Sequence, residues 1–320
     1  MEDKMSLTKP SLLITILVFY LLILSFIYAL DYASIQQEVL REYRAYRIAY
    51  ALIAGGILGA CGVFLQSSLR NPLVDHYVLG IGSGALFAFY LSYLVFRGGV
   101  ALPSIMSIAG GLLSLFLTIG VAERISGSEV SYVLSGLAIN SLFSGFSMML
   151  SYIVVKVNPY ASFYLVGSFV LATKDKLPLL ILPLALIVTG YIFLAKPLNA
   201  IMIGDLHAKQ VGYDPRLTRL ASVIVGGVAS SIVVSLFGLL GFIGLVSPHI
   251  SRLLLRTGDN RLVIPASFAI GSMVVYSTDL LSRKLLASFV GEVPAGAIAS
   301  MIGAPFFLIV LLTRLKGRAS

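Results

Sequence analysis

Long apolar runs with at most one charged residue each recur along this chain and limit what it can fold into. A helix that crosses a bilayer needs about 20 such residues, because the hydrocarbon core is about 30 Å thick and each residue rises about 1.5 Å. Nine runs are long enough, and a tenth, shorter run contains Pro248 and has the length of a half-helix. The ten runs lie at about 12–30, 47–67, 79–96, 99–121, 131–155, 177–195, 217–238, 241–255, 262–282 and 297–313. They predict an all-α polytopic membrane protein of one domain, residues 1–320, with about ten transmembrane helices.

The composition excludes a soluble enzyme, a disordered chain and a disulfide-stapled secreted module. Apolar residues make up 58% of the 320 residues and charged residues only 12%, whereas soluble domains carry about 25% charged residues. Cys61 is the only cysteine, so the chain can form neither an intrachain disulfide nor a multi-cysteine metal site. The run 12–30 can also be interpreted as a signal peptide. It is long for one and lacks a small-x-small cleavage site, so we expect an uncleaved first helix.

Lysine and arginine residues predict the orientation, because they concentrate in cytoplasmic loops. An even number of helices places both termini on one side. With the termini inside, 14 basic residues fall on the inner side and 9 on the outer side. We therefore expect cytoplasmic termini and a multi-pass protein that contacts the lipid bilayer of the cytoplasmic (inner) membrane. The net charge of +9 follows mostly from this topology, and we expect no nucleic-acid partner.

Few polar residues interrupt the apolar runs. Asp279 lies in the run 262–282, with Arg283 four residues later on the same helical face. This pair favours a structural or docking role, and an ion-coupled secondary transporter or channel that uses Asp279 is the alternative function. Gln66 and Asn140 are the conspicuous uncharged polar residues of the runs. Each is interpreted either as an interhelical hydrogen bond or as a ligand contact.

Small residues within the run 47–67 indicate close helix packing. Gly55, Gly59 and Gly62 follow one another at intervals of three and four residues. In lipid, where burying apolar surface yields little, small residues let two backbones approach and so hold helices together.

The sequence shows no catalytic motif. It contains no phosphate-binding loop of the Gly-x4-Gly-Lys-Ser/Thr type, no paired acids and no HExxH or GxSxG arrangement. We therefore expect a transporter or channel subunit that is not an enzyme, without a catalytic or metal site.

A series of motifs in a fixed order then resembles one known family. They are GGILGACGVFLQSSLRNPLVDHYVLGIGSGA from Gly55, KPLN at 196–199, GFIGLVSPHISRLL at 241–254, TDLLSR at 278–283, EVPAG at 292–296 and IGAPFF at 302–307. Over roughly residues 44–314, the chain resembles the FecCD-type permease subunits of ABC importers for iron-siderophores, haem and cobalamin.

The resemblance implies a division of labour between proteins. The family's permeases form homodimers of ten-helix subunits around a central path. Two cytoplasmic ATPase subunits bind ATP and Mg, so no cofactor is expected in this chain. An external substrate-binding protein delivers the metal chelate.

The resemblance also implies a coupling loop that contacts the ATPase. Within a cytoplasmic loop at 196–216, the stretch IGDLHAKQVG at 203–212 is similar to the family's Leu-Gly-Glu-x-x-Ala-x-x-Leu-Gly. Ile203, Asp205 and Val211 replace Leu, Glu and Leu, which keeps the character of each position. The other interpretation is an ordinary helix connector. The candidate coupling residues are Gly204, Asp205, Leu206, His207, Ala208, Val211 and Gly212.

A docking surface for the binding protein is implied at the outer ends of the helices. Arg44-Ala45-Tyr46-Arg47 resembles the family's Arg-x-Pro-Arg, with Tyr46 in place of proline, and Arg283 matches an arginine of the TDLLSR motif. Arg44, Arg47 and Arg283 are expected to meet glutamates, since the guanidinium fork binds carboxylate at two points. Solvated arginines that extend toward the lipid headgroups are the alternative. By family analogy, Asn140 and Gln66 are the candidate residues of the translocation path.

Overall fold

The computed structural model describes residues 20, 38–96, 101–157, 166–170, 174–286 and 292–319. Within these ranges every regular element is a helix, which confirms the all-α class. The elements are α2 (Glu38–Ser68), α3 (Ile81–Phe96), α4 (Ala101–Ile125), α5 (Glu129–Val157), η2 (Lys174–Leu180), α7 (Ile181–Ile203), α8 (Asp205–Gln210), α9 (Pro215–Phe237), α10 (Ile243–Leu255), α11 (Asn260–Leu281), η3 (Ser282–Leu286) and α13 (Ala295–Ala319).

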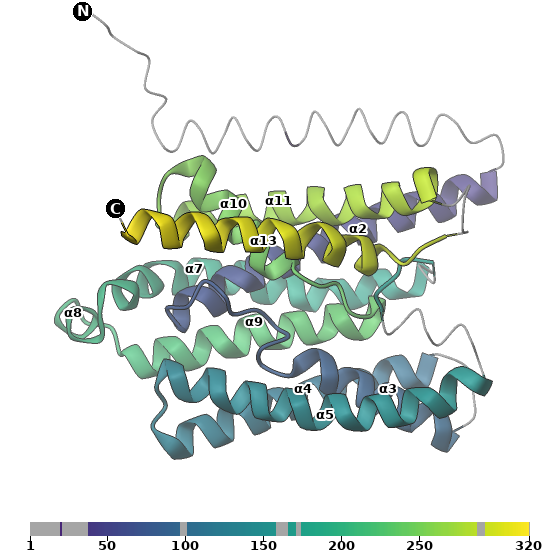
Figure 1. Cartoon of the computed structure of the whole chain (residues 1–320), viewed down its shortest axis with the longest axis horizontal. Coiled ribbons are helices and arrows are strands. Elements are labelled where there is room, and N and C mark those ends of the chain that lie inside the picture. The colour runs from purple at the N-terminus through teal and green to yellow at the C-terminus, as the bar shows by residue number, and fades with distance from the viewer. Residues whose placement is uncertain are drawn as a thin grey trace, which may run out of the picture.

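The long helices lie side by side and run between two ends of the molecule (Figure 1). One end carries α8 and the C-terminal end of α13, and we call it the α8 end. The opposite end carries η2 and the start of α2, and we call it the η2 end. α2 is central, because it packs against α11, α9, α10 and α7. The helices α3, α4 and α5 form a second group, which joins the first through contacts with α9.

Most of the predicted apolar runs coincide with helices of the structure. The exception is the run 12–30, which lies outside the described residues apart from Tyr20. Among the residues that the structure describes, six helices are long and apolar enough to cross a membrane: Leu40–Ser68, Leu102–Ile125, Glu129–Val157, Lys176–Ile203, Pro215–Phe237 and Asn260–Lys284. Shorter apolar helices are formed by α3, α10 and the Ala295–Phe306 part of α13. The number of ten spans therefore stays a prediction.

The connector between α7 and α9 is shorter than the loop predicted at 196–216. That boundary was wrong, because α7 continues to Ile203 and α9 begins at Pro215. Pro197 lies inside α7 without ending it. Pro197 and Leu198 are both buried, and this packing offsets the hydrogen bond that proline cannot donate. The connector covers residues 204–214 and contains α8.

The glycines of α2 bring neighbouring backbones into direct contact. A methyl group added at Gly55 would overlap the carbonyl oxygen of Gly271 in α11, and Gly59 meets the α11 backbone in the same way. At Gly62 the obstacle is the carbonyl oxygen of Gly244 in α10. The structure thus confirms that these small residues serve close helix packing.

The variant Gly62→Ala is expected to lower the free energy of unfolding by about 3 kcal/mol, the upper end of ordinary overpacking, because rigid backbone blocks the new methyl group. Gly120→Ala in α4 is the matched control, since a methyl group there meets open space. Unfolding in detergent can be followed with a thiol-reactive fluorophore, because the single cysteine, Cys61, is buried. Equal thermal midpoints for the two variants would contradict the packing interpretation.

Two linkers run through the interior of the protein. Residues leading into α3, including Leu79 and Gly80, are buried, and the segment 238–242 before α10 is mostly buried. Irregular backbone at membrane depth needs its polar groups satisfied within the protein. Ser114 Oγ donates a hydrogen bond to the carbonyl oxygen of Gly80 at 2.7 Å, and Thr118 Oγ1 donates to that of Leu79 at 3.1 Å. These α4 hydroxyls allow α3 to begin inside the body.

Candidate coupling and docking sites

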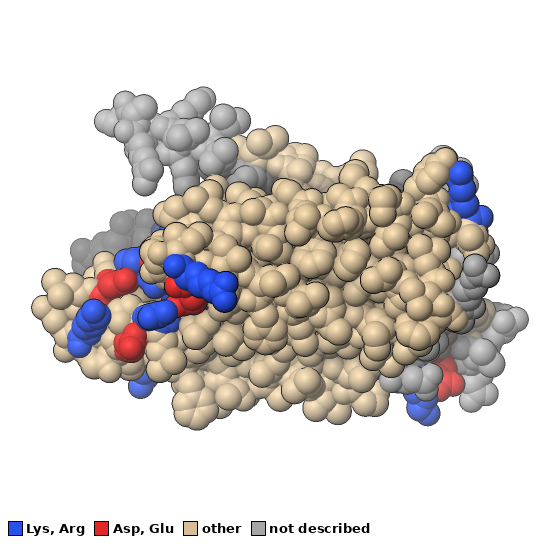
Figure 2. Space-filling model, turned by 90° about the horizontal axis from the view of Figure 1, so that it is seen from below, with Lys and Arg blue, Asp and Glu red and all other residues tan. Residues whose placement is uncertain are grey.

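Charged side chains gather at the two ends of the molecule. In the face shown by Figure 2, Lys, Arg, Asp and Glu cluster at one end and reappear at the opposite end, and a broad uncharged zone separates them. Exposed apolar side chains, among them Leu134, Phe146 and Ile192, occupy helices between the ends. This distribution suits helices that lie in a hydrocarbon layer with both ends in water.

Three large apolar side chains are exposed on α8 and directly before and after it, and we call them the apolar face of the connector. Leu206 is 72% exposed, Ile203, the last residue of α7, is 71% exposed, and Val211, which follows α8, is 49% exposed. Lys209 and Gln210 are also exposed on α8. Ala208 is fully buried beneath them, and its carbonyl oxygen accepts a hydrogen bond from the Tyr213 backbone N–H at 2.9 Å. The exposed large side chains, rather than Ala208, are therefore placed to contact a partner.

The connector is tied to the body by a cluster of four charged residues that the sequence analysis missed. Asp205, the first residue of α8, accepts a hydrogen bond from Arg70 Nη2 at 2.9 Å and lies 3.4 Å from Arg219 Nη2. Glu129, the first residue of α5, accepts from Arg70 Nε at 2.7 Å and from Arg219 Nη2 at 2.6 Å. Arg219 also donates to the carbonyl oxygen of Gly127. We call Arg70, Glu129, Asp205 and Arg219 the charge quartet.

A separate ion pair lies at the same end of the molecule. Arg216 Nε of α9 donates to Glu123 Oε2 of α4 at 2.7 Å, and Tyr132 of α5 donates its hydroxyl hydrogen to Glu123 Oε1 at 2.7 Å. Neither Glu123 nor Arg216 belongs to α8. It therefore joins body helices without involving the connector.

At the η2 end, a buried ion cluster surrounds Asp279. Arg47 Nη2 and Nε donate to Asp279 Oδ1 at 2.6 and 3.0 Å, and Arg283 Nε donates to Oδ2 at 2.9 Å. Arg47 also pairs with Glu292, and its Nη1 lies 3.4 Å from the Tyr43 hydroxyl. The pair expected from the spacing of Asp279 and Arg283 is confirmed. Arg47 joins this pair from α2, which is far away in the sequence but packs against α11.

The arginines expected to dock a binding protein differ in their surroundings. Arg47 is almost completely buried and Arg283 has little exposed side chain, because both are engaged with Asp279. Arg44 is half-buried one turn earlier on α2. The structure thus places two of the three guanidinium groups inside the protein rather than on an open surface.

The two candidate path residues also differ. Gln66 is buried, donates to the carbonyl oxygen of Gly244 at 3.0 Å and accepts from Arg252 Nη1 at 2.6 Å. Of its two interpretations, the interhelical hydrogen bond is the one that the structure shows. Asn140 is half-exposed on α5, beside the exposed Ser141.

The KPLN motif joins α7 to the start of α11. Asn199 Nδ2 donates to Asp259 Oδ1 at 2.6 Å, and its Oδ1 accepts from the backbone N–H of Asn260 at 2.8 Å. Hydrogen bonds from Arg261 hold the pKa of the Asp259 carboxyl well below its ordinary value, at about 2. The Asn199 side chain of the motif therefore holds the fold together at the α8 end.

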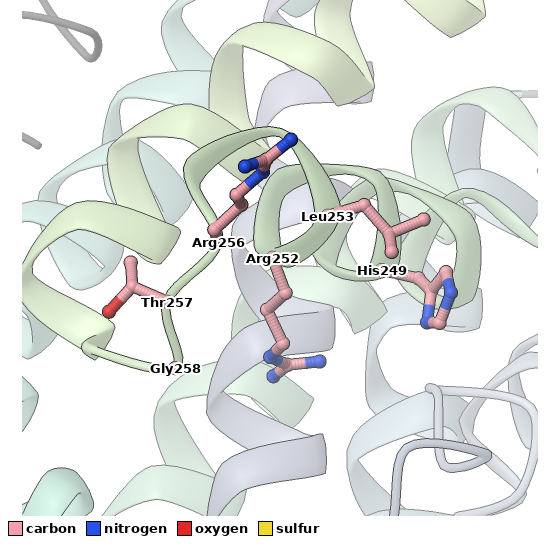
Figure 3. A pocket seen from close by; sticks show the side chains of 6 residues that line it. All are labelled: His249, Arg252, Leu253, Arg256, Thr257 and Gly258. Carbon is pink, nitrogen blue, oxygen red and sulfur yellow. The ribbon is translucent and has the colours of Figure 1, made fainter. Parts of the chain in front are cut away.

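A pocket of about 340 Å³ opens beside the last turns of α10. It is lined by His249, Arg252, Leu253, Arg256, Thr257 and Gly258. Figure 3 shows the Arg252 and Arg256 side chains leaving the backbone in opposite directions, so they do not converge on one anion. Elsewhere in the part of the chain that the structure describes, no three His, Cys, Asp or Glu residues gather as a set of metal ligands.

Long apolar helices with charges gathered at both ends define a multi-pass membrane protein. The chain belongs to the FecCD transport family, whose sequence model matches residues 11–313. It is 30% identical over 283 residues to the Iron(3+)-hydroxamate import system permease protein FhuB of Bacillus subtilis, covering 88% of this chain and 73% of that protein. It is also 30% identical over 283 residues to the Vitamin B12 import system permease protein BtuC of Vibrio cholerae, with 88% and 85% covered.

The fold agrees with this assignment. A solved structure of a metal-chelate type ABC transporter in an inward-facing conformation matches with a TM-score of 0.80 and 26% identity, covering 95% of this chain and 99% of that one. The resemblance seen in the motifs is therefore confirmed. The chain is an ABC importer permease and a multi-pass protein of the inner membrane.

Proposed function

We propose that this chain is the membrane-spanning subunit of an ATP-driven importer for a metal chelate of the ferric siderophore, haem or cobalamin class. The observation that carries the proposal is the exposed apolar face of the α8 connector, anchored to the body by Asp205. Such a face suits a groove on a separate ATPase. The named substrates of the relatives, iron(3+)-hydroxamate and vitamin B12, support the class of cargo.

The α8 end faces the cytoplasm in this proposal, with both termini on that side of ten spans. The excess of Lys and Arg on the inner side supports this orientation. Two ATPase subunits bind ATP and Mg and contact the connector of each permease subunit. Two copies of this chain form the homodimer, and the half-exposed Asn140 face of α5 lines the path between them.

The η2 end then receives the external binding protein. Arg44 is the first contact for acidic groups of that protein. Arg47 and Arg283 contribute indirectly, because their side chains are held in the cluster around Asp279 and Glu292. Exposed charge pairs at an interface chiefly raise the association rate, so docking of this kind weakens with salt.

The ion-coupled alternative finds no support in the surroundings of Asp279. Both carboxylate oxygens already accept guanidinium hydrogen bonds, from Arg47 and Arg283. A coupling carboxylate must bind and release its ion in each cycle. Asp279 is instead a fixed counter-charge for two arginines.

The test is reconstitution of the permease in liposomes, alone and with its ATPase and binding protein. We expect the permease alone to hydrolyse no ATP above a mock preparation. The complete assembly is expected to take up a radiolabelled ferric siderophore, haem or cobalamin only when ATP is present. Uptake by the permease alone, driven by an ion gradient without ATP, would overturn the proposal.

A further inference from the structure

The charge quartet joins three helices and the turn that follows α2. Arg70 follows α2, Glu129 begins α5, Asp205 begins α8 and Arg219 lies in α9. Each arginine contacts both carboxylates, so the four side chains form a closed ring of two positive and two negative charges. Within this ring, Asp205 is the member that belongs to the connector.

The ring is more tightly held at Glu129 than at Asp205. Arg219 is only 5% exposed, and it contacts Glu129 at 2.6 Å but Asp205 at 3.4 Å. The Asp205 side chain is 45% exposed. Removing the charge of Asp205 therefore leaves both arginines paired with Glu129, and the body of the protein keeps its ion pairs.

Besides the quartet, apolar packing attaches the connector to the body, because Ala208 is part of the main hydrophobic core and Tyr213 packs against it. Gly204 and Gly212 flank α8, and both have open space around them. Gly212 has a φ of 86°, a conformation that favours glycine. Buried Ala208 also holds α8 against the body, but its methyl group can make only non-directional apolar contacts. Between two glycines, the quartet is the directional link from α8 to the body.

The quartet ends on α5, which packs against α3 and α4 along one stripe. In α5 the buried residues form one narrow stripe, and most of the remaining surface is exposed. A displacement of α8 that is passed through Arg70 and Arg219 thus acts on Glu129, the first residue of α5. The negative side chain also suits this position, because it lies at the positive end of the helix dipole.

We propose that Asp205 is a positioning residue that transmits movement of α8 to α5 through Arg70, Arg219 and Glu129. The inference rests on the proposed function, in which an ATPase moves α8. In this arrangement the ATPase binds the apolar face of the connector and displaces α8. The quartet then transmits this displacement to α5, a helix that lines the path. Asp205 is then needed for coupling but not for assembly.

The first test compares Asp205→Asn with Glu123→Gln in the full assembly. Glu123 is the matched control, because it also pairs with an α9 arginine, and its hydrogen bonds go to Arg216 and Tyr132 rather than to α8. We expect Asp205→Asn to bind the ATPase normally and to lower the cargo transported per ATP hydrolysed by about tenfold, within the usual range of coupling between sites. Glu123→Gln is expected to keep the wild-type ratio, and Asp205→Glu to restore it.

The second test measures whether α8 and α5 move together. Spin labels are placed at Lys209→Cys and Val130→Cys, two exposed positions, in a Cys61→Ala background. With Asp205 present, we expect the distance between the labels to stay the same in the nucleotide-free and ATP-trapped states. In Asp205→Asn, the distance should broaden and shift when ATP is trapped. The same distance distributions in both proteins would overturn the inference.

These outcomes separate the inference from the proposed function. If the assembly with Asp205 shows no ATP-dependent uptake at all, the proposed function fails. If that assembly works and Asp205→Asn keeps the wild-type ratio of cargo to ATP, the role of the quartet fails while the proposed function stands.

Discussion

Replacing Arg47 by methionine is expected to cost about 3 kcal/mol of unfolding free energy, in the range for breaking a buried ion pair. Arg47 supplies three hydrogen bonds to the fully buried Asp279 and pairs with Glu292. Without it, Arg283 is the charged partner left on Asp279, and Glu292 loses the pair that holds it to α2. The thermal midpoint in detergent, followed through the reactivity of Cys61, measures the loss.

An exposed arginine–aspartate pair provides the matched control for this variant. Arg261 pairs with Asp259 but is 56% exposed, so Arg261→Met should cost less than about 1 kcal/mol. If the two single variants lose the same stability, the Asp279 cluster is not a buried structural element.

The sequence predicted features that depend on neighbours along the chain. Apolar runs located the helices, because one long uncharged segment is sufficient evidence for one helix. The spacing of Asp279 and Arg283 predicted their pair, since residues four apart share a helical face. Gly62 was recognised as a packing residue for a similar reason, although the sequence did not name Gly244 as the residue it meets.

Features that join distant segments were not predictable in the same way. Arg47 lies 232 residues from Asp279, and Arg70 lies 135 residues from Asp205. In the sequence, Arg219 was explained by membrane topology, and Arg70 lay in addition within a family motif. No local pattern indicates which acid each one meets. Their occurrence near the ends of apolar runs was the available signal.

The sequence therefore predicted where the candidate sites lie better than it predicted which side chains are exposed in them. Family motifs identified the 203–212 stretch, but only the fold shows that Ala208 is buried while Leu206 is exposed. The same holds for Gln66, whose amide is used by Gly244 and Arg252 inside the protein. Side-chain direction on a short helix depends on how its flanking turns are built, and this follows from tertiary packing.

The variant Leu206→Glu is expected to lower both the affinity for the ATPase and the rate of ATP-dependent uptake by at least tenfold. Leu206 is the most exposed side chain of the apolar face that it forms with Ile203 and Val211. A carboxylate at the centre of an apolar contact must lose its water without gaining a partner, which costs more than about 1.4 kcal/mol and hence more than tenfold in affinity. Pull-down of the ATPase and uptake by liposomes measure the two effects.

Leu179→Glu is the matched control, because Leu179 is an exposed leucine of η2 at the opposite end of the molecule. It introduces the same charge and a similar change in volume, so it should leave ATPase binding unchanged. Since Leu206 is exposed in the free subunit, its substitution should not lower the thermal midpoint of the permease. Lost binding without lost stability therefore assigns Leu206 to the interface. Wild-type ATPase binding by a stable Leu206→Glu protein would place the coupling contact elsewhere on the α8 end.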